Sequence, residues 1–371
     1  MTLISLLKDL KNKDIKLWLD GDTIQYKVGD GEPPEYLQTQ IETHKADLVQ
    51  ILSRSQKTRQ IEKVSRDGWL PLSYAQEGVW YLEQLNPGTT AHNMSSTWML
   101  NGELDEGLLQ GALTQITARH EVLRSAFQVV DGQPCISINE AEEIDFRSID
   151  LSRFDATIQM AEAEKQIKAQ QAIPLELGSP PLLRVCLFKL SPDRHILQIV
   201  IHHIISDAWS VGVLLREMCA AYDGRSGLLE LPIQYVDFAA WQRQQLENEN
   251  QARDLAYWKK QLKDAPALLE LPTDFQRPPE LDYAGDTIWG EIPAALFSRV
   301  ESLSKTEGAT PFMVLLSAFK LLLQRQSGTD DVVVGTPMVN RSQVETEDLI
   351  GFFLNNLALR TDLSNDPTFR Q

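Results

Sequence analysis

The hydrophobic positions of the first 55 residues follow two different spacings. An apolar segment, 15–19, is followed by the turn Asp20-Gly21-Asp22 and by the segment 23–28, in which Ile24, Tyr26 and Val28 alternate with polar residues, and this is the pattern of a β-hairpin. Helical spacing precedes and follows this hairpin. The residues that carry it are Leu3, Leu6, Leu7 and Leu10 before the hairpin and Leu37, Ile41, Leu48, Ile51 and Leu52 after it. The pattern predicts a small αββα unit over residues 1–55, near the lower size limit of a stable domain.

From about residue 70 onward, helical and strand spacings alternate along the chain. Helices are predicted over 72–85, 105–119, 161–171, 209–222 and 311–324, and strands over 96–100, 122–130, 182–190, 196–203, 287–292 and 331–335. Such alternation predicts an α/β or α+β fold with a mixed sheet. Polar stretches divide the chain into four parts. These are a small domain at 1–55, a linker at 56–69, a first lobe at 70–241 and a second lobe at 242–371.

One predicted strand ends in a cluster of chemically active side chains. The segment 196–201 is apolar on both faces, as in a central strand that is covered on both sides, and it runs into His202 and His203. Adjacent strand residues point to opposite faces, so the two imidazoles are not expected to share a metal ion. One interpretation is that both histidines are buried core residues and that Ser206 or Asp207 caps the next helix. Proton transfer by a histidine that faces a cleft is the favoured one.

Composition narrows the classes of function. The formal net charge is −17, which argues against a nucleic-acid or anionic-membrane partner. The three cysteines are far apart and form no CxxC pair, so they indicate a reducing compartment and no zinc site. The N-terminus has no signal-peptide pattern, and no apolar run reaches the roughly 20 residues that a membrane span requires. These features predict a cytoplasmic protein without a metal.

Five stretches resemble motifs of one enzyme family, and they occur in that family's order. They are Ser73-Tyr-Ala-Gln-Glu-Gly-Val-Trp80, Arg119-His-Glu-Val-Leu-Arg124 with Phe127, His202-His-Ile-Ile-Ser-Asp-Ala-Trp-Ser210, Tyr235-Val-Asp-Phe-Ala-Ala-Trp241 and Ile350-Gly-Phe-Phe-Leu-Asn-Asn-Leu-Ala-Leu-Arg360. Together they resemble the condensation domains of nonribosomal peptide synthetases. The resemblance implies two lobes, each similar to chloramphenicol acetyltransferase, with the histidine motif between them. The family's sixth and seventh motifs are not found, so a C-terminally truncated second lobe is expected.

The resemblance also implies a reaction and a set of site residues. The reaction is amide formation between an upstream acyl or peptidyl thioester and a downstream aminoacyl amine, both held on 4′-phosphopantetheine arms of partner carrier proteins. The domain is then expected to need no cofactor of its own. His203 takes the role of general base or of the group that orients the amine, and His202 is structural. Asp207 is expected to pair with Arg124 rather than with Arg119, which is interpreted as an ordinary exposed arginine.

The αββα unit resembles the TubC-type docking domains that precede some condensation domains. The resemblance implies that a C-terminal tail of the upstream synthetase adds alongside the hairpin, with Gln25, Tyr26 and Lys27 as the predicted contact residues. Strand addition to an unpaired edge is the physical basis. Lys16 and Lys27 would attract an acidic tail. The alternative is that both lysines are simply solvated.

Two positions depart from the family pattern. Ala208 replaces the glycine that follows the motif aspartate, and Gly78 stands where many relatives carry a basic residue. The pattern around Gly78 favours a domain that joins two L-residues. An alternative function is a catalytically inactive or incomplete domain that serves as a docking platform. The N-terminal unit argues against a stand-alone acyltransferase. The stretch 350–360 argues against an epimerisation domain, and the presence of both histidines argues against a heterocyclisation domain.

Overall fold

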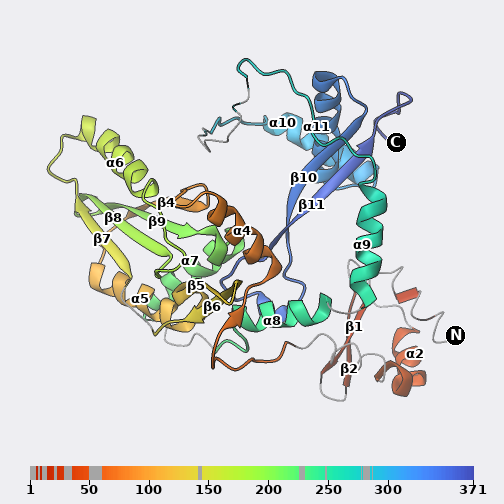
Figure 1. Ribbon diagram of the computed structural model, residues 1–371, viewed down its shortest axis with the longest axis horizontal. Helices are drawn as coiled ribbons and strands as arrows, with labels where there is room; N and C mark the ends of the chain where they lie inside the picture. Colours follow the sequence, from red (N-terminus) through yellow and green to blue (C-terminus); the bar gives the residue numbers. More distant parts are fainter. Residues whose placement is uncertain are drawn as a thin grey trace. The chain divides into compact units, whose positions relative to one another are not determined.

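The chain divides into two compact units, residues 1–63 and 64–371. The computed structural model describes residues 6, 9–10, 15–20, 23–28, 36–49, 61–140, 144–224, 230–246, 249–276, 278, 285 and 287–371. Figure 1 shows the elements within each unit.

The first unit contains the predicted hairpin and a helix beside it. Strand β1 (Ile15–Asp20) pairs antiparallel with β2 (Thr23–Val28), and helix α2 (Leu37–Thr43) follows. Buried side chains from β1, from α2 and from the segments before and after them form one core, and half-buried residues of β1 and β2 pack against it. The buried side chains are Leu6, Leu10, Ile15, Leu37, Ile41 and Leu48, with Leu17, Ile24 and Tyr26 packed against them. Among the described residues, β1 and β2 form a two-stranded sheet, so each strand has an outer edge without a described partner strand.

The second unit carries the remaining described elements, and most of the predicted ones are confirmed. The helices are α4 (Tyr74–Leu85), α5 (Glu106–Arg119), α6 (Ala156–Gln171), α7 (Ala208–Tyr222), α8 (Tyr235–Leu246), α9 (Glu249–Gln261), α10 (Ala294–Thr306) and α11 (Pro311–Ser327), with short 3-10 turns η1 (Glu121–Arg124), η2 (His203–Ile205) and η3 (Val344–Thr346). The strands are β3 (Leu70–Pro71), β4 (Asn93–Asn101), β5 (Ser125–Val130), β6 (Gln133–Ile138), β7 (Asp145–Asp150), β8 (Leu183–Ser191), β9 (Arg194–His202), β10 (Asp331–Val339) and β11 (Leu354–Asp362).

Strand β9 lies inside a four-stranded mixed sheet in the order β4-β9-β8-β7. Both neighbours of β9 are antiparallel to it, whereas β7 runs parallel to β8. Helix α6 packs against β4, β8 and β9. Every residue of β9 after Arg194 is buried, which agrees with the apolar pattern that predicted a doubly covered strand. The sheet therefore holds the end of β9, and with it the histidine pair, in a fixed place.

Three predicted strands differ from the structure. The segment 122–130 begins as the turn η1 and becomes strand β5 only at Ser125. No strand is formed at 287–292, where Ile288 is 97% exposed and no described segment pairs with it. Strand β10 is longer than the predicted 331–335, and most of its residues are half-buried or exposed. Alternation alone identifies apolar rows, but a strand also needs a partner for its backbone groups.

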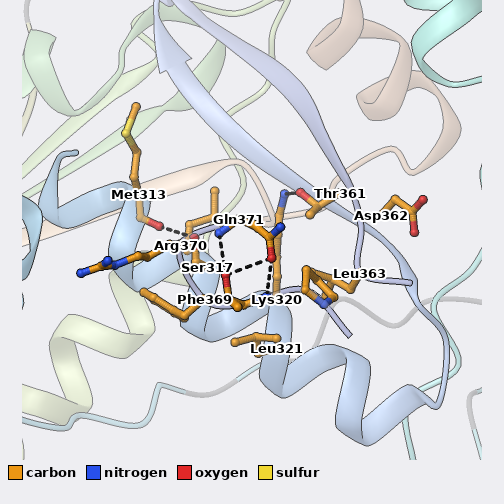
Figure 2. A pocket seen from close by; sticks show the side chains of 13 residues that line it. Met313, Ser317, Lys320, Leu321, Thr361, Asp362, Leu363, Phe369, Arg370 and Gln371 are labelled. Carbon is orange, nitrogen blue, oxygen red and sulfur yellow. Dashed lines mark hydrogen bonds between the residues drawn. The ribbon is translucent and has the colours of Figure 1, made fainter. Parts of the chain in front are cut away.

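Beyond α9, a helix packs against a two-stranded sheet. Strands β10 and β11 are antiparallel, and α11 contacts β10 and α10. Helix α11 begins as predicted, because the Thr310 hydroxyl accepts a hydrogen bond from the Met313 N–H. Its Lys320 is buried and donates hydrogen bonds to the Leu359 carbonyl and the Thr361 hydroxyl (2.8 and 2.6 Å) beside a cavity of about 280 Å³ (Figure 2). Burial lowers the pKa of the Lys320 ammonium.

Candidate functional site

The two histidines lie where β9 ends, and they face different surroundings. His202 is the last residue of β9 and is 1% exposed, while His203 opens the turn η2 and is half-buried. The backbone of β4 and the segment before it hold this point, because the His203 N–H donates to the His92 carbonyl at 2.8 Å. The fold thus holds the two rings in different surroundings.

The His203 ring is oriented by one hydrogen bond and one aromatic contact. Its Nδ1 lies 2.8 Å from the Ser206 carbonyl oxygen, and a carbonyl can only accept. The proton of the neutral ring is therefore on Nδ1, and Nε2 carries the free electron pair. The ring of Phe352 meets the imidazole edge to face, with centroids 4.8 Å apart. This tautomer is the one that a base or an acceptor acting through Nε2 requires.

His202 belongs to a buried cluster with Glu83 of α4 and His92. The Glu83 Oε1 atom lies 2.6 Å from His92 Nδ1 and 3.4 Å from His202 Nε2. Burial lowers the pKa of His202, which favours its neutral ring. Burial alone would raise the pKa of the Glu83 carboxyl, but the contacts with His202 and His92 hold it at about 2. The cluster fastens α4 to the ends of β4 and β9.

The same three side chains have the composition of a metal site, but their protonation argues against one. The Ile204 N–H donates to His202 Nδ1 at 3.1 Å, so the proton of the neutral ring is on Nε2, on the side of Glu83. A metal at this position would need the electron pair of Nε2. The proton would then have to move to Nδ1, against the Ile204 N–H. The Glu83 carboxylate is hydrogen-bonded to His92, whereas the buried His202 Nε2 lies 3.4 Å from it without a hydrogen bond.

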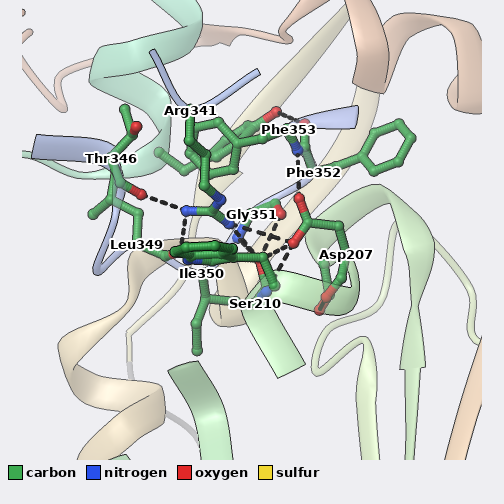
Figure 3. Close-up of polar contacts among 12 residues, drawn as sticks. Asp207, Ser210, Arg341, Thr346, Leu349, Ile350, Gly351, Phe352 and Phe353 are labelled. Carbon is green, nitrogen blue, oxygen red and sulfur yellow. Dashed lines mark hydrogen bonds and ion pairs between the residues drawn. The ribbon is translucent and has the colours of Figure 1, made fainter. Parts of the chain in front are cut away.

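Asp207 is the centre of a buried polar network at the start of α7 (Figure 3). Asp207 is the N-cap of α7, and its Oδ1 atom accepts hydrogen bonds from the N–H and the hydroxyl of Ser210. Its Oδ2 atom accepts from the Phe353 N–H at 3.1 Å. The Arg341 guanidinium completes the network, 3.4 Å from Asp207 Oδ1 and 2.8 Å from the Ser210 hydroxyl. Both charged groups are almost fully buried, and they tie the segment 341–353 to α7.

The predicted partner of Asp207 is therefore wrong. Arg341 makes this contact, while Arg124 donates to the Asn139 carbonyl beside β6. Arg119 is also not an ordinary exposed residue, since its Nε lies 3.2 Å from Glu217. Sequence separation explains the first error. Arg341 lies 134 residues from Asp207, and only the fold brings the two together.

The other motif-like stretches converge on the same place. The buried Gln76 of α4 donates its side-chain N–H to the Ile204 carbonyl at 3.0 Å, which supports the turn after the histidines. His120 follows the last residue of α5, and its Nε2 lies 2.8 Å from Oε2 of Glu217 on α7. Its Nδ1 accepts a hydrogen bond from the Ile350 N–H at 3.4 Å. Segments up to 230 residues apart are joined in this way.

The Tyr235 ring leaves no room for a side chain at position 351. The Tyr235 hydroxyl donates to the Phe352 carbonyl at 2.6 Å and lies 2.8 Å from the Ser73 hydroxyl, and burial raises the pKa of Tyr235. A Cβ atom at position 351 would lie 1.9 Å from the Tyr235 ring. Glycine is therefore required at 351 for space rather than for an unusual backbone conformation.

The two departures from the family pattern cause no local strain. Ala208 is the first residue of α7 and is exposed, and it is not among the non-glycine residues with positive φ. The glycine usual at this position is not required by the backbone conformation seen here. Gly78 is exposed on α4, and a Cβ atom added there would meet nothing within 4 Å, so the site has room for a larger side chain.

A cavity of about 170 Å³ lies next to Phe352. Its lining includes Tyr74 of α4, Gln242 of α8, Asn340 and Asn355, along with Phe352 itself. Phe352 therefore has the His203 ring as a neighbour and also forms part of this cavity wall.

The predicted docking residues lie on β2. Gln25 is exposed and pairs with Trp18 across the hairpin, and Tyr26 is half-buried and packs against the core of the first unit. The backbone of Lys27 pairs with that of Lys16, but the side chains of both lysines lie outside the described residues. These residues therefore lie on a strand that has an outer edge without a described partner strand.

Sequence reasoning missed Glu83, His92, Arg341 and the pair formed by Arg66 and Asp237. Arg66 donates through two nitrogens to the fully buried Asp237 (2.7 and 3.0 Å) and through Nε to Glu121 (2.8 Å). These contacts hold the end of the expected linker against α8 and η1. Asp237 lies in the motif-like stretch Tyr235–Trp241, but that stretch does not indicate its partner, Arg66.

Comparison with known proteins identifies the family. The Condensation domain model matches residues 66–371, and the TubC N-terminal docking domain model matches residues 3–54. The chain belongs to the condensation-domain family. Its N-terminal part belongs to the TubC-type docking domains.

The relatives of this condensation domain are peptide synthetases and their subunits. It is 41% identical over 331 residues to a subunit of linear gramicidin synthase from Brevibacillus parabrevis, covering 88% of this chain and 6% of that protein. The chain thus spans a small fraction of the length of the relatives it matches.

Solved structures share the fold. The condensation domain that mediates chain release from the enacyloxin polyketide synthase matches with a TM-score of 0.68 at 25% identity, covering 100% of this chain and 73% of that one. The X-domain from teicoplanin biosynthesis, solved in complex with OxyB, matches with a TM-score of 0.73 at 27% identity, covering 84% and 69%. The expected mixed α/β condensation fold is confirmed.

The helices of this condensation domain are short relative to a bilayer. Among the described residues, no single helix is long and apolar enough to span a membrane. The consecutive helices α10 and α11 reach the length and apolar composition of a membrane span only when they are taken together, and they are bent by 107° relative to each other.

Proposed function

We propose that this chain forms amide bonds as the condensation domain of a nonribosomal peptide synthetase. The substrates are an acyl or peptidyl thioester on an upstream carrier and an aminoacyl thioester on a downstream carrier. The carriers supply the 4′-phosphopantetheine arms, and the domain contributes no cofactor. The observation that carries the proposal is the half-buried His203, whose Nδ1–H is fixed on the Ser206 carbonyl so that Nε2 offers its electron pair.

The reaction needs a neutral amine next to the thioester carbonyl. A free α-amino group has a pKa of about 7.7–8.0, so a fraction of it is protonated at neutral pH. The amine nitrogen attacks the carbonyl carbon, the C–N bond forms, and the C–S bond breaks with release of the carrier thiol. His203 Nε2 accepts a hydrogen bond from the amine or takes its proton, which passes to the leaving sulfur. Holding both tethered reactants at one point supplies much of the rate.

The supporting residues act on the position of His203. His202 and Glu83 fix the end of β9, and Asp207 with Arg341 fixes the segment that carries Phe352. Arg124 has no assigned part in this arrangement. We place the reaction in the cytoplasm, because Cys135, Cys186 and Cys219 are all free thiols. We further propose docking, linker, first-lobe and second-lobe regions at 1–55, 56–69, 70–241 and 242–371.

A dipeptide assay with two loaded carriers tests the function. We expect product from the wild-type chain and at least a 100-fold loss in His203→Gln, whose amide keeps a donor for the Ser206 carbonyl but cannot act as a base. Asn365→Ala, a change at an exposed turn, is the control and should leave the rate unchanged. A wild-type rate in His203→Gln would contradict the role of the imidazole.

A docking platform without catalysis is the second candidate, and the likeness to an X-domain solved in complex with OxyB favours it. The same assay separates the two candidates. A folded chain that binds both loaded carriers in a pull-down but forms no dipeptide would support the platform.

We also propose that residues 1–55 bind the C-terminal tail of an upstream synthetase beside Gln25, Tyr26 and Lys27. The outer edges of the β1–β2 sheet support this assignment. Calorimetry with C-terminal peptides of synthetases from the same genome tests it. Lys27→Glu should weaken the binding of an acidic tail. Lys45→Glu should leave this binding unchanged, because Lys45 lies on the helical segment after α2 and pairs with Glu42.

A further inference from the structure

The imidazole of His203 is restrained at two points, and only one of them is polar. The hydrogen bond from Nδ1–H to the Ser206 carbonyl fixes one atom of the ring. A ring held by a single hydrogen bond can still tilt about that bond, so Nε2 would sweep over a range of positions. The Phe352 ring, 4.8 Å away and inclined by 64°, opposes this tilt.

Phe352 is well suited to this task because its own backbone is fastened on both sides. Its carbonyl accepts from the Tyr235 hydroxyl at 2.6 Å, and the N–H of Phe353 donates to Asp207 Oδ2 at 3.1 Å. The preceding Gly351 exchanges two hydrogen bonds with the Ser210 hydroxyl (2.8 and 3.0 Å). Groups from α7 and α8 thus place the phenyl ring beside His203.

The Phe352 ring also lines the cavity of about 170 Å³, so removing its outer atoms would enlarge this space. Because neighbouring side chains relax only partly into such a space, the imidazole would gain freedom to tilt.

We infer that Phe352 is a positioning residue of the reaction centre, which holds the His203 imidazole in the orientation that presents Nε2 to the amine. The inference rests on the proposed function. It extends it by assigning a catalytic effect to an apolar residue that has no proton to transfer.

Two substitutions at position 352 test the inference in the two-carrier assay. Phe352→Leu keeps an apolar side chain but removes the aromatic contact, and we expect kcat to fall about 10- to 100-fold with KM changed less than about threefold. Phe352→Tyr keeps the ring and should retain at least about a third of the wild-type kcat. Phe154→Leu, a change of the same kind at an exposed position, should leave both constants unchanged. Equal kcat values for Phe352→Leu and the wild type would overturn the inference.

Nuclear magnetic resonance of ¹⁵N,¹³C-histidine-labelled protein gives a readout that needs no activity. The carbon-bound protons of His203, assigned by their loss in His203→Gln, should be shifted by the Phe352 ring current in the wild type. The shift should persist in Phe352→Tyr and disappear in Phe352→Leu, while the thermal unfolding midpoint of each variant reports on folding. If the wild type forms no dipeptide, the proposed function fails. If His203 resonances are the same in Phe352→Leu as in the wild type, the positioning role fails.

Discussion

At the scale of single residues, neighbouring backbone groups decide what each histidine can do. His202 Nδ1 faces an N–H, that of Ile204, and His203 Nδ1 faces a carbonyl, that of Ser206. The two adjacent imidazoles are therefore held in opposite tautomers. This difference leaves His202 with its Nε2–H on the side of Glu83 and His203 with an electron pair on Nε2.

Space decides the residue at position 351. In Gly351→Ala the new methyl group would meet the Tyr235 ring at 1.9 Å, so we expect a loss of at least about 2 kcal/mol in the free energy of unfolding. Urea unfolding followed by circular dichroism measures it. Gly78→Ala is the matched control, because open space surrounds its position on α4, and it should stabilise the protein by about 0.5–1 kcal/mol. Equal stabilities of the two variants would show that the Tyr235 contact is not tight in solution.

At the scale of elements, buried charges join segments that backbone hydrogen bonds do not connect. The cluster of Glu83, His92 and His202 connects α4 with the ends of β4 and β9. The network of Asp207, Ser210 and Arg341 connects α7 with the segment before β11. Both fix elements that flank His203.

The Glu83 cluster predicts a dependence of stability on pH. The pKa of Glu83 is lowered to about 2 from its ordinary value of 4.5, so the folded state favours the ionised carboxylate. Its contribution, on the order of 3 kcal/mol, is fully present above pH 4.5 and is lost as the pH falls toward 2. The stability difference between wild type and Glu83→Gln should therefore shrink over this interval. Urea unfolding at pH 7, 5 and 3 measures it, with the exposed Glu164→Gln as control; a difference that stays constant would contradict the prediction.

Two ion pairs between α7 and the segment 341–353 allow a direct comparison of buried and exposed charges. Arg341→Met leaves Asp207 buried without its cation, and we expect a loss of about 3–5 kcal/mol in unfolding free energy. Arg216→Met removes the pair with Asp348, whose side chains are 58% and 68% exposed, and should cost less than about 1 kcal/mol. Chemical denaturation of both variants measures the contrast. Losses of similar size would mean that the Asp207 network is open to water.

At the scale of the whole molecule, charge is divided unevenly along the chain. Residues 1–63 contain ten basic and ten acidic residues, so the whole net charge of −17 belongs to residues 64–371. The first unit, residues 1–63, is thus neutral overall, while the proposed docking region 1–55 has seven basic and nine acidic residues and a net charge of −2. Such a division suits a protein whose first unit recruits a partner and whose second unit performs the reaction.

The sequence by itself determined the elements and the family. Strong periodicity identified the hairpin, the main helices and the buried strand β9, because a face that must be buried leaves a regular trace along the chain. Five motif-like stretches identified the condensation domain, and the histidine pair marked the candidate site. The prediction of a strand at 287–292 was wrong, because pairing depends on a partner that local spacing does not reveal.

Only the tertiary structure decided which polar groups meet. Asp207 pairs with Arg341 and not with Arg124, and the Glu83 carboxylate lies between His92 and His202. The Phe352 ring lies beside His203. Each of these contacts joins residues that are far apart in the sequence or belong to different elements. The physical reason is that a buried charge or ring is satisfied by whatever the fold brings within a few ångströms, and spacing along the chain carries no record of that distance.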